Sequence, residues 1–174
     1  MAHSVELLFD ARTEDTLRGM WTALADAGLP SQADIRSGTN RPHVTLSVAE
    51  RIGGAVDPAL VALADLLPLP CLIGSPVLFG GRRVTLARLI VPSAGLLAFQ
   101  TETHRRCLPF LRPGPLPHAE PGQWTPHTTL GRRIDPADLG RALAAAPGGD
   151  ISASLCGLRR WDSDTRVSHV LIGR

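Results

Sequence analysis

Two pentapeptides, Pro42-His43-Val44-Thr45-Leu46 and Pro126-His127-Thr128-Thr129-Leu130, share the pattern Pro-His-x-Thr-Leu and lie 84 positions apart in the 174-residue chain. For a chain of this composition, roughly 0.06 chance matches to His-x-Thr-Leu are expected. Two matches, each preceded by a proline, are therefore no accident of composition. They indicate that one structural unit occurs twice, once in each half of the chain.

The elements expected around the two motifs repeat in the same order. Apolar spacing and turn residues predict strand, helix, strand, helix and strand in residues 1–80 and again in residues 81–174, followed by one more strand. The 84-residue offset also aligns Leu7 with Val91. We therefore expect a single bilobal domain over residues 1–174, built by duplication of this unit. Strands are expected at 4–10, 43–48 and 71–79 in the first half, and at 83–91, from 127, at 150–159 and at 166–172 in the second. Helices are expected at 13–27, 58–67, 94–111 and 136–145, and a loop at 112–123.

Composition limits the class of protein. The chain is 44% hydrophobic, which is enough for a packed core, yet no apolar run approaches the ~20 residues needed to span a bilayer. All 18 basic residues are arginine and the formal net charge is +2, too small for broad attraction to a polyanion. Three widely spaced cysteines, Cys71, Cys107 and Cys156, suggest buried free thiols. We expect a cytoplasmic monomer that does not bind membranes and needs no cofactor.

Strand geometry limits what each motif can do. Successive side chains of a strand point to opposite faces, so His43 and Thr45 share one face while Leu46 points away from it. The same alternation pairs His127 with Thr129. If the two motif strands face each other across a cleft, two imidazoles and two hydroxyls converge on one point. One imidazole can then remove a proton, the other can donate one, and the hydroxyls can bind a phosphoryl group.

With both motifs in register over nearly the whole chain, the sequence resembles the 2H phosphoesterase superfamily, in its 2'-5' RNA ligase-like and cyclic nucleotide phosphodiesterase branch. The resemblance implies an α+β fold with a pseudo-twofold axis and antiparallel-rich sheets that face a central cleft. It also implies metal-independent hydrolysis of a 2',3'-cyclic phosphate to a 2'-phosphate, or the making and breaking of 2'-5' phosphodiester linkages. Substrates would be RNA ends or small nucleotides with a cyclic phosphate. His43 and His127 would be the catalytic pair, and Thr45 and Thr129 the phosphate ligands.

Three further residues are candidates for substrate binding. The resemblance places an arginine or aromatic residue five positions after the second histidine, which here is Arg132. Strict alternation from His127 turns Arg133 to the site instead, so Arg132 requires a bulge or the end of the strand. Trp161 and Trp124 are candidates for stacking on a base, although a lone tryptophan is more often part of a core.

Two other hypotheses use the same residues differently. A nucleotide-binding module could use the cleft without turnover, and a metal-dependent hydrolase could use the six histidines. His104 and Cys107 could share a metal on one helical face, but no second pair of ligands accompanies them. The sequence leaves open which motif histidine is the acid and which is the base.

Overall fold

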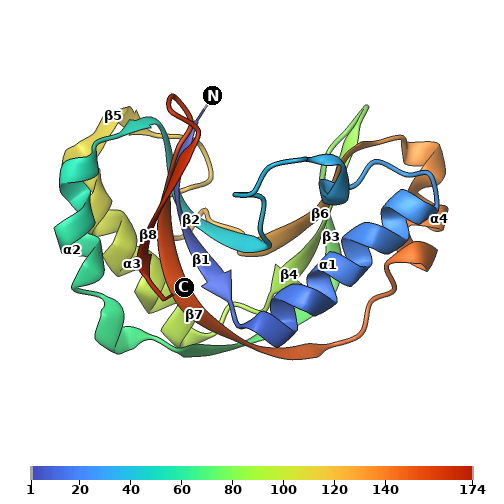
Figure 1. Ribbon diagram of the computed structural model, residues 1–174, viewed down its shortest axis with the longest axis horizontal. Coiled ribbons are helices and arrows are strands. Elements are labelled where there is room, and N and C mark those ends of the chain that lie inside the picture. Colours follow the sequence, from blue (N-terminus) through green and yellow to red (C-terminus); the bar gives the residue numbers. More distant parts are fainter. Residues whose placement is uncertain (1, 174) are drawn as a thin grey trace.

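The computed structural model describes residues 2–173. It is an α+β protein whose main elements follow the expected order with one additional strand, β5, so the predicted fold class is confirmed (Figure 1). No helix in the described range is long and apolar enough to cross a membrane. The main elements are β1 (His3–Phe9), α1 (Ala11–Asp26), β2 (His43–Ile52), α2 (Asp57–Val61), β3 (Leu69–Gly80), β4 (Val84–Ile90), α3 (Ala94–Cys107), β5 (Leu111–Pro115), β6 (His127–Ile134), α4 (Leu139–Ala145), β7 (Ile151–Asp162) and β8 (Val167–Ile172).

The strands form one continuous antiparallel sheet in the order β5-β2-β1-β7-β3-β4-β6, with β8 also paired to β7. The long strand β7 joins the two lobes. Its Leu155 lies opposite Phe9 of β1 on one side and Leu69 of β3 on the other. The two antiparallel regions expected from the sequence are therefore parts of a single curved sheet.

The helices exchange between the lobes (Figure 1). Helix α1 follows β1 in the chain but packs against β6 and α4, and helix α3 follows β4 but packs against β2 and α2. One lobe thus holds β1, β2, β5, β8, α2 and α3, and the other holds β3, β4, β6, α1 and α4. Each lobe takes elements from both halves of the sequence.

Each motif ends in a β-bulge at its leucine. Along β2, Thr45 pairs with Glu6 and Ser47 with the preceding Val5, so Leu46 is an extra residue. Along β6, Thr129 pairs with Ala87 and Gly131 with Leu86, so Leu130 is the extra residue there. A bulge shifts the alternation of side chains by one position.

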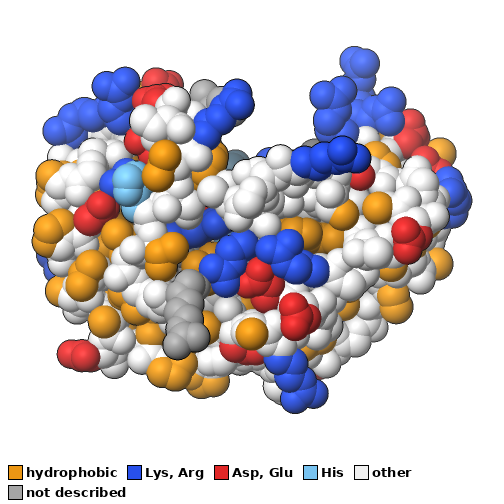
Figure 2. Space-filling view, in the orientation of Figure 1, with side chains coloured by type: hydrophobic (Ala, Val, Ile, Leu, Met, Phe, Trp, Pro, Cys, Tyr) orange, Lys and Arg blue, Asp and Glu red, His pale blue; other side chains and the backbone are white. Residues whose placement is uncertain are grey.

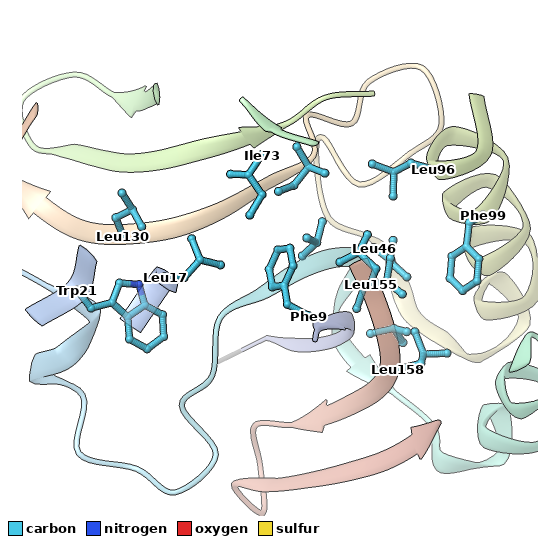
Figure 3. Close-up of a cluster of buried hydrophobic side chains, with 14 of the residues drawn as sticks. Phe9, Leu17, Trp21, Leu46, Ile73, Leu96, Phe99, Leu130, Leu155 and Leu158 are labelled. Carbon is cyan, nitrogen blue, oxygen red and sulfur yellow. The ribbon is translucent and has the colours of Figure 1, made fainter. Parts of the chain in front are cut away.

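Both bulged leucines are fully buried and belong to one hydrophobic core. Figure 3 shows Leu130 beside Leu17 and Trp21 of α1, and Leu46 on the side of the core where α3 contributes Phe99. Burying a leucine side chain contributes about 1.5–3 kcal/mol. The core therefore holds the last residue of each motif firmly while the histidine and threonine stay outside it.

The strand register corrects the alignment of the first strands. His43 lies opposite Leu8 and His127 opposite Leu89, so β1 and β4 correspond with an offset of 81 residues (8 to 89) rather than 84. The expected match of Leu7 with Val91 is therefore wrong. The connection from β4 to β6 is three residues longer than that from β1 to β2. The motifs are therefore 84 positions apart, although the strands that pair with them, β1 and β4, correspond with an offset of 81.

Two local expectations also differ. The range 112–123, expected as a loop, begins inside the short strand β5, where Pro113 and Pro115 are tolerated because β5 is an edge strand that pairs only with β2. The helix expected at 58–67 is instead α2 followed by a separate 3-10 turn at Ala64–Leu66. Neither difference changes the position of the motifs.

Gly131, beside the second bulge, allows the chain before η1 (Gln32–Asp34) to pack closely on β6. A Cβ atom at this position would collide with the backbone carbonyl of Pro30 and press on the side chain of Ile134. We predict that Gly131→Ala lowers the free energy of unfolding by roughly 1–3 kcal/mol, as overpacking does. Urea unfolding measures this.

Gly19→Ala is the matched control for this prediction. Gly19 is exposed in α1, and a Cβ atom there would meet no other atom within 4 Å, so alanine should stabilise by up to about 1 kcal/mol. Equal effects of the two substitutions would contradict the close approach at β6.

Candidate active site

The two motif histidines are held in the same way. His43 begins β2 and His127 begins β6, and the Cα atoms of these two strands come within 8 Å of each other. The Nδ1 atom of His43 lies 2.7 Å from the carbonyl oxygen of Arg41, and that of His127 lies 2.7 Å from the carbonyl oxygen of Thr125. In each motif, the proline (Pro42 or Pro126) lies between the histidine and the residue whose carbonyl it binds.

These hydrogen bonds determine which nitrogen is free for chemistry. A carbonyl oxygen can only accept, so Nδ1 must carry a proton in both histidines. The neutral form of each imidazole then has its lone pair on Nε2. Both Nε2 atoms can exchange a proton with a substrate while the rings keep their orientation.

The histidines line two neighbouring cavities that share Thr45 and Val48. His127 lies in an apolar cavity of about 480 Å³, and His43 lies in a more polar cavity of about 700 Å³. Thr45 therefore stands at the junction between them. Thr129 is half-buried on β6 and does not line either of these two cavities.

Two indoles hold the motif backbone at the bulges. The Nε1 atom of Trp124 donates to the carbonyl of Thr45 at 2.8 Å, and that of Trp21 donates to the carbonyl of Thr129 at 3.0 Å. Trp124 also lines the apolar cavity. Its N–H group is thus used to hold the motif, and only its ring surface is available to a ligand. Trp21 was not singled out from the sequence.

The bulge at Leu130 directs Arg132 to the cleft. Because the extra residue shifts the alternation, Arg132 rather than Arg133 continues the face of His127. Arg132 lines the polar cavity, whereas Arg133 has a φ of 63° and is exposed elsewhere. A second register shift between Gly131 and Ile134 accompanies this left-handed residue.

The surroundings of His127 oppose its protonation. Burial lowers the pKa of His127, and the positive charges of His43 and Arg132 lower it further, although the bond to the Thr125 carbonyl acts in the other direction. The ring also packs on Phe79, with centroids 4.5 Å apart. His127 is therefore biased toward the neutral form that can act as a base.

Arginines and Trp161 surround the polar cavity. Trp161 lies on β7 opposite Ser4 and lines the cavity together with His43. Figure 2 shows arginine side chains on both raised sides of the hollow at the top of the molecule. The cavity is lined by Arg36, Arg132, Arg159 and Arg166.

Glu6 is a site residue that sequence reasoning missed. It is 5% exposed on β1, lines the polar cavity, and its Oε1 atom lies 3.6 Å from Nε2 of His43. A glutamate between Val5 and Leu7 in a predicted strand is a signal that could have drawn attention to it, because a buried carboxylate needs partners. Arg159, opposite Glu6 on β7, supplies them.

The other histidines lie apart from the motif pair, except that His118 lines the apolar cavity. Within residues 2–173, one group of metal-ligating side chains is close enough to hold an ion: His3, Asp162 and Asp164, which contains neither motif histidine. His104 and Cys107 do not form such a group there.

Burial raises the pKa of Cys71 to about 12 and that of Cys107 to about 11, so these thiols stay protonated at neutral pH. All three cysteines are free, and only Cys107 is fully buried.

The same fold occurs in solved phosphoesterase structures. E. coli LigT complexed with 3'-AMP matches 99% of this chain and 94% of its own with a TM-score of 0.56 at 14% identity, and LigT complexed with NADP+ matches the same shares with a TM-score of 0.55 at 16% identity. Kluyveromyces marxianus Usb1 with uridine monophosphate matches 99% and 98% with a TM-score of 0.54 at 13% identity. No protein-family model and no curated protein sequence matches the chain. The resemblance to the 2H phosphoesterases is therefore confirmed at the level of fold.

The electrostatics of the bulge lead to a test by NMR. Arg132→Ala should raise the pKa of His127, because it removes a positive charge that opposes protonation. Arg133→Ala is the matched control and should leave the titration of His127 in place. A shift with Arg133→Ala but not with Arg132→Ala would show that strict alternation, rather than the bulge, determines which arginine reaches the site.

Proposed function

We propose that the protein is a metal-independent phosphoesterase that hydrolyses 2',3'-cyclic phosphates on RNA ends or small nucleotides to 2'-phosphates. It would also make or break 2'-5' phosphodiester linkages. One observation carries the proposal: each motif histidine has its Nδ1 atom fixed by a backbone carbonyl, which leaves Nε2 for proton transfer, and the two rings line neighbouring cavities that share Thr45. Such a pair can supply an acid and a base to one phosphorus atom.

The reaction needs one neutral and one protonated imidazole. The neutral Nε2 accepts a proton from water as the water oxygen bonds to phosphorus. The bond from phosphorus to the 3'-oxygen breaks, and the protonated Nε2 gives its proton to that oxygen. The Thr45 hydroxyl donates to a non-bridging oxygen, where negative charge develops in the transition state. Thr129 would assist on the opposite side of the phosphoryl group.

The two cavities suit the two parts of a nucleotide. The apolar cavity presents Phe79 and Trp124, whose ring faces can stack on a base. The polar cavity presents Trp161 and arginines, including Arg132, which suit ribose and phosphate. The nucleotides in the LigT and Usb1 structures support a nucleotide ligand here.

Incubation with 2',3'-cyclic AMP in excess EDTA tests the reaction and its direction. We expect full turnover and a 2'-phosphate product, because the two imidazoles replace the metal and the 3'-oxygen is the leaving group. Chromatography separates the two phosphate isomers. A 3'-phosphate product would refute the geometry, loss of activity with EDTA would favour a metal-dependent hydrolase, and no turnover of any cyclic or 2'-5' substrate would favour a binding module.

Substitution of the motif residues tests their roles. His43→Ala and His127→Ala should each lower kcat by at least ~10²-fold and up to ~10⁴-fold, as loss of a general acid or base does, and Thr45→Ala should cost less. Thr129→Ala should have the smallest effect of the four, since Thr129 does not line the cavities. His104→Ala and His169→Ala are controls. Equal losses in the controls would indicate a folding defect instead.

A further inference from the structure

Glu6 is held in a fixed position by three strands. On β1 it lies opposite Thr45 of β2 and Arg159 of β7, so the three side chains share one face of the sheet. Its Oε2 atom accepts from Nε of Arg159 at 2.7 Å and lies 2.7 Å from Nη2, while its Oε1 atom accepts from the Ser4 hydroxyl at 2.5 Å. The Arg159 guanidinium therefore binds Oε2, whereas the other oxygen, Oε1, is the one near His43.

The carboxylate is charged at neutral pH. Burial raises the pKa of Glu6, but the charges of His43 and Arg159 and the hydrogen bonds from Ser4 and Arg159 outweigh this effect, so that its pKa is lowered overall. Glu6 is thus a buried anion that faces the cleft. Among the described residues that line the two cavities, it is the only carboxylate.

A carboxylate in this place works against the binding of a phosphate. Like charges repel more strongly where solvent is excluded. The surroundings are otherwise basic, and a buried ion pair of Glu6 with Arg159 is weak evidence of stabilisation, because desolvation offsets the Coulomb attraction. The position of Glu6 therefore calls for a role beyond holding the sheet together.

The contact with His43 indicates that role. The 3.6 Å separation of Oε1 from Nε2 is too long for a hydrogen bond, yet it is short for two opposite charges. The carboxylate thus stabilises the protonated imidazole without engaging its Nε2 proton. That proton stays available to a leaving group.

Among residues 2–173, no carboxylate occupies the corresponding position beside the second motif. His43 pairs with Leu8 and Thr45 with Glu6, whereas His127 pairs with Leu89 and Thr129 with Ala87. Ala87 thus occupies the position that corresponds to Glu6, and it is fully buried and uncharged. The charges that face His127 are those of His43 and Arg132, both positive when protonated.

We propose that Glu6 is a positioning residue that makes His43 the general acid and, through the contrast with Ala87, leaves His127 as the general base. This inference rests on the proposed function. The charged groups that face the histidine pair are Glu6 from β1, Arg159 from β7 and Arg132 from β6, while Arg36 and Arg166 line the same cavity. Of these only Glu6 favours an imidazolium, and it lies beside His43 alone.

The assignment determines the pH dependence of the reaction. His127 must be neutral, so the rate rises with pH as His127 loses its proton. His43 must be protonated, so the rate falls at higher pH as His43 loses its proton. Removing the negative charge of Glu6 weakens the protonated form of His43 and moves only the alkaline fall of the rate to lower pH.

Glu6→Gln tests the proposal in two ways. In the pH profile of kcat on 2',3'-cyclic AMP, we expect a loss of roughly tenfold or more on the alkaline side of the wild-type optimum and little loss on the acid side, with KM for this anion unchanged or lower. In NMR spectra of the free protein, His43 should stay protonated to higher pH than His127, and Glu6→Gln should reduce this difference. Glu6→Asp keeps the charge and should restore part of both effects.

Asp57→Asn is the matched control, because Asp57 forms a similar pair with the neighbouring buried arginine, Arg160, through bonds of 2.6 and 2.9 Å. It should cost similar stability and leave the alkaline fall in place. If Glu6→Gln does not fold, Glu6→Gln combined with Arg159→Gln removes both charges and should still reduce the NMR difference. An unchanged order of protonation in the charge-removing variant, or a shift of the acid side only, would overturn the role of Glu6. If no substrate is turned over but the NMR difference depends on Glu6, the proposed function fails while the effect of Glu6 on His43 stands.

Discussion

The bulged leucine at the end of each motif is the constraint on which the site depends. Leu46 and Leu130 are extra residues in their strands and are buried in one core, and the preceding threonine and histidine are thereby turned outward. The bulge also leaves the carbonyl of Thr45 and that of Thr129 to be satisfied by an indole N–H from outside the sheet. A shift of either strand by one residue would bury the histidine and expose the leucine, at a cost of several kcal/mol.

On this nearly symmetric backbone, the differences between the two motifs lie in the residues across the strands. Glu6 and Ala87 occupy corresponding positions, and Arg132 on the His127 side has a counterpart in Val48, the cleft-facing residue after the first bulge. Symmetry of position brings two imidazoles together, but two identical imidazoles would compete for one proton. In the proposed reaction, the asymmetry of charge around them would give each imidazole a separate task.

The sequence predicted the fold class and the motif pair because both depend on local pattern. Strand alternation placed His43 with Thr45, and the repeated proline, histidine and leucine made the duplication visible. The sequence could not show that Arg132 rather than Arg133 faces the cleft, since that depends on where a bulge forms in β6. A glutamate among apolar residues of β1 is visible in the sequence, but its role is not, because its partners come from β2 and β7, at positions 43 and 159. Such long-range pairings appear in no window of local sequence.

The exchange of helices between lobes connects these features. Helix α1 brings Trp21 to the carbonyl of Thr129, and helix α3 packs behind β2, so each motif strand is supported by the helix that precedes the other motif in the chain. Separate halves of the sequence would therefore leave each motif strand without its supporting helix and its apolar face exposed to water. Because β7 also spans both lobes, the spacing of the two imidazoles is fixed by the same contacts that form the core. The contacts that hold the core together therefore also hold the two motif histidines in their places along the sheet.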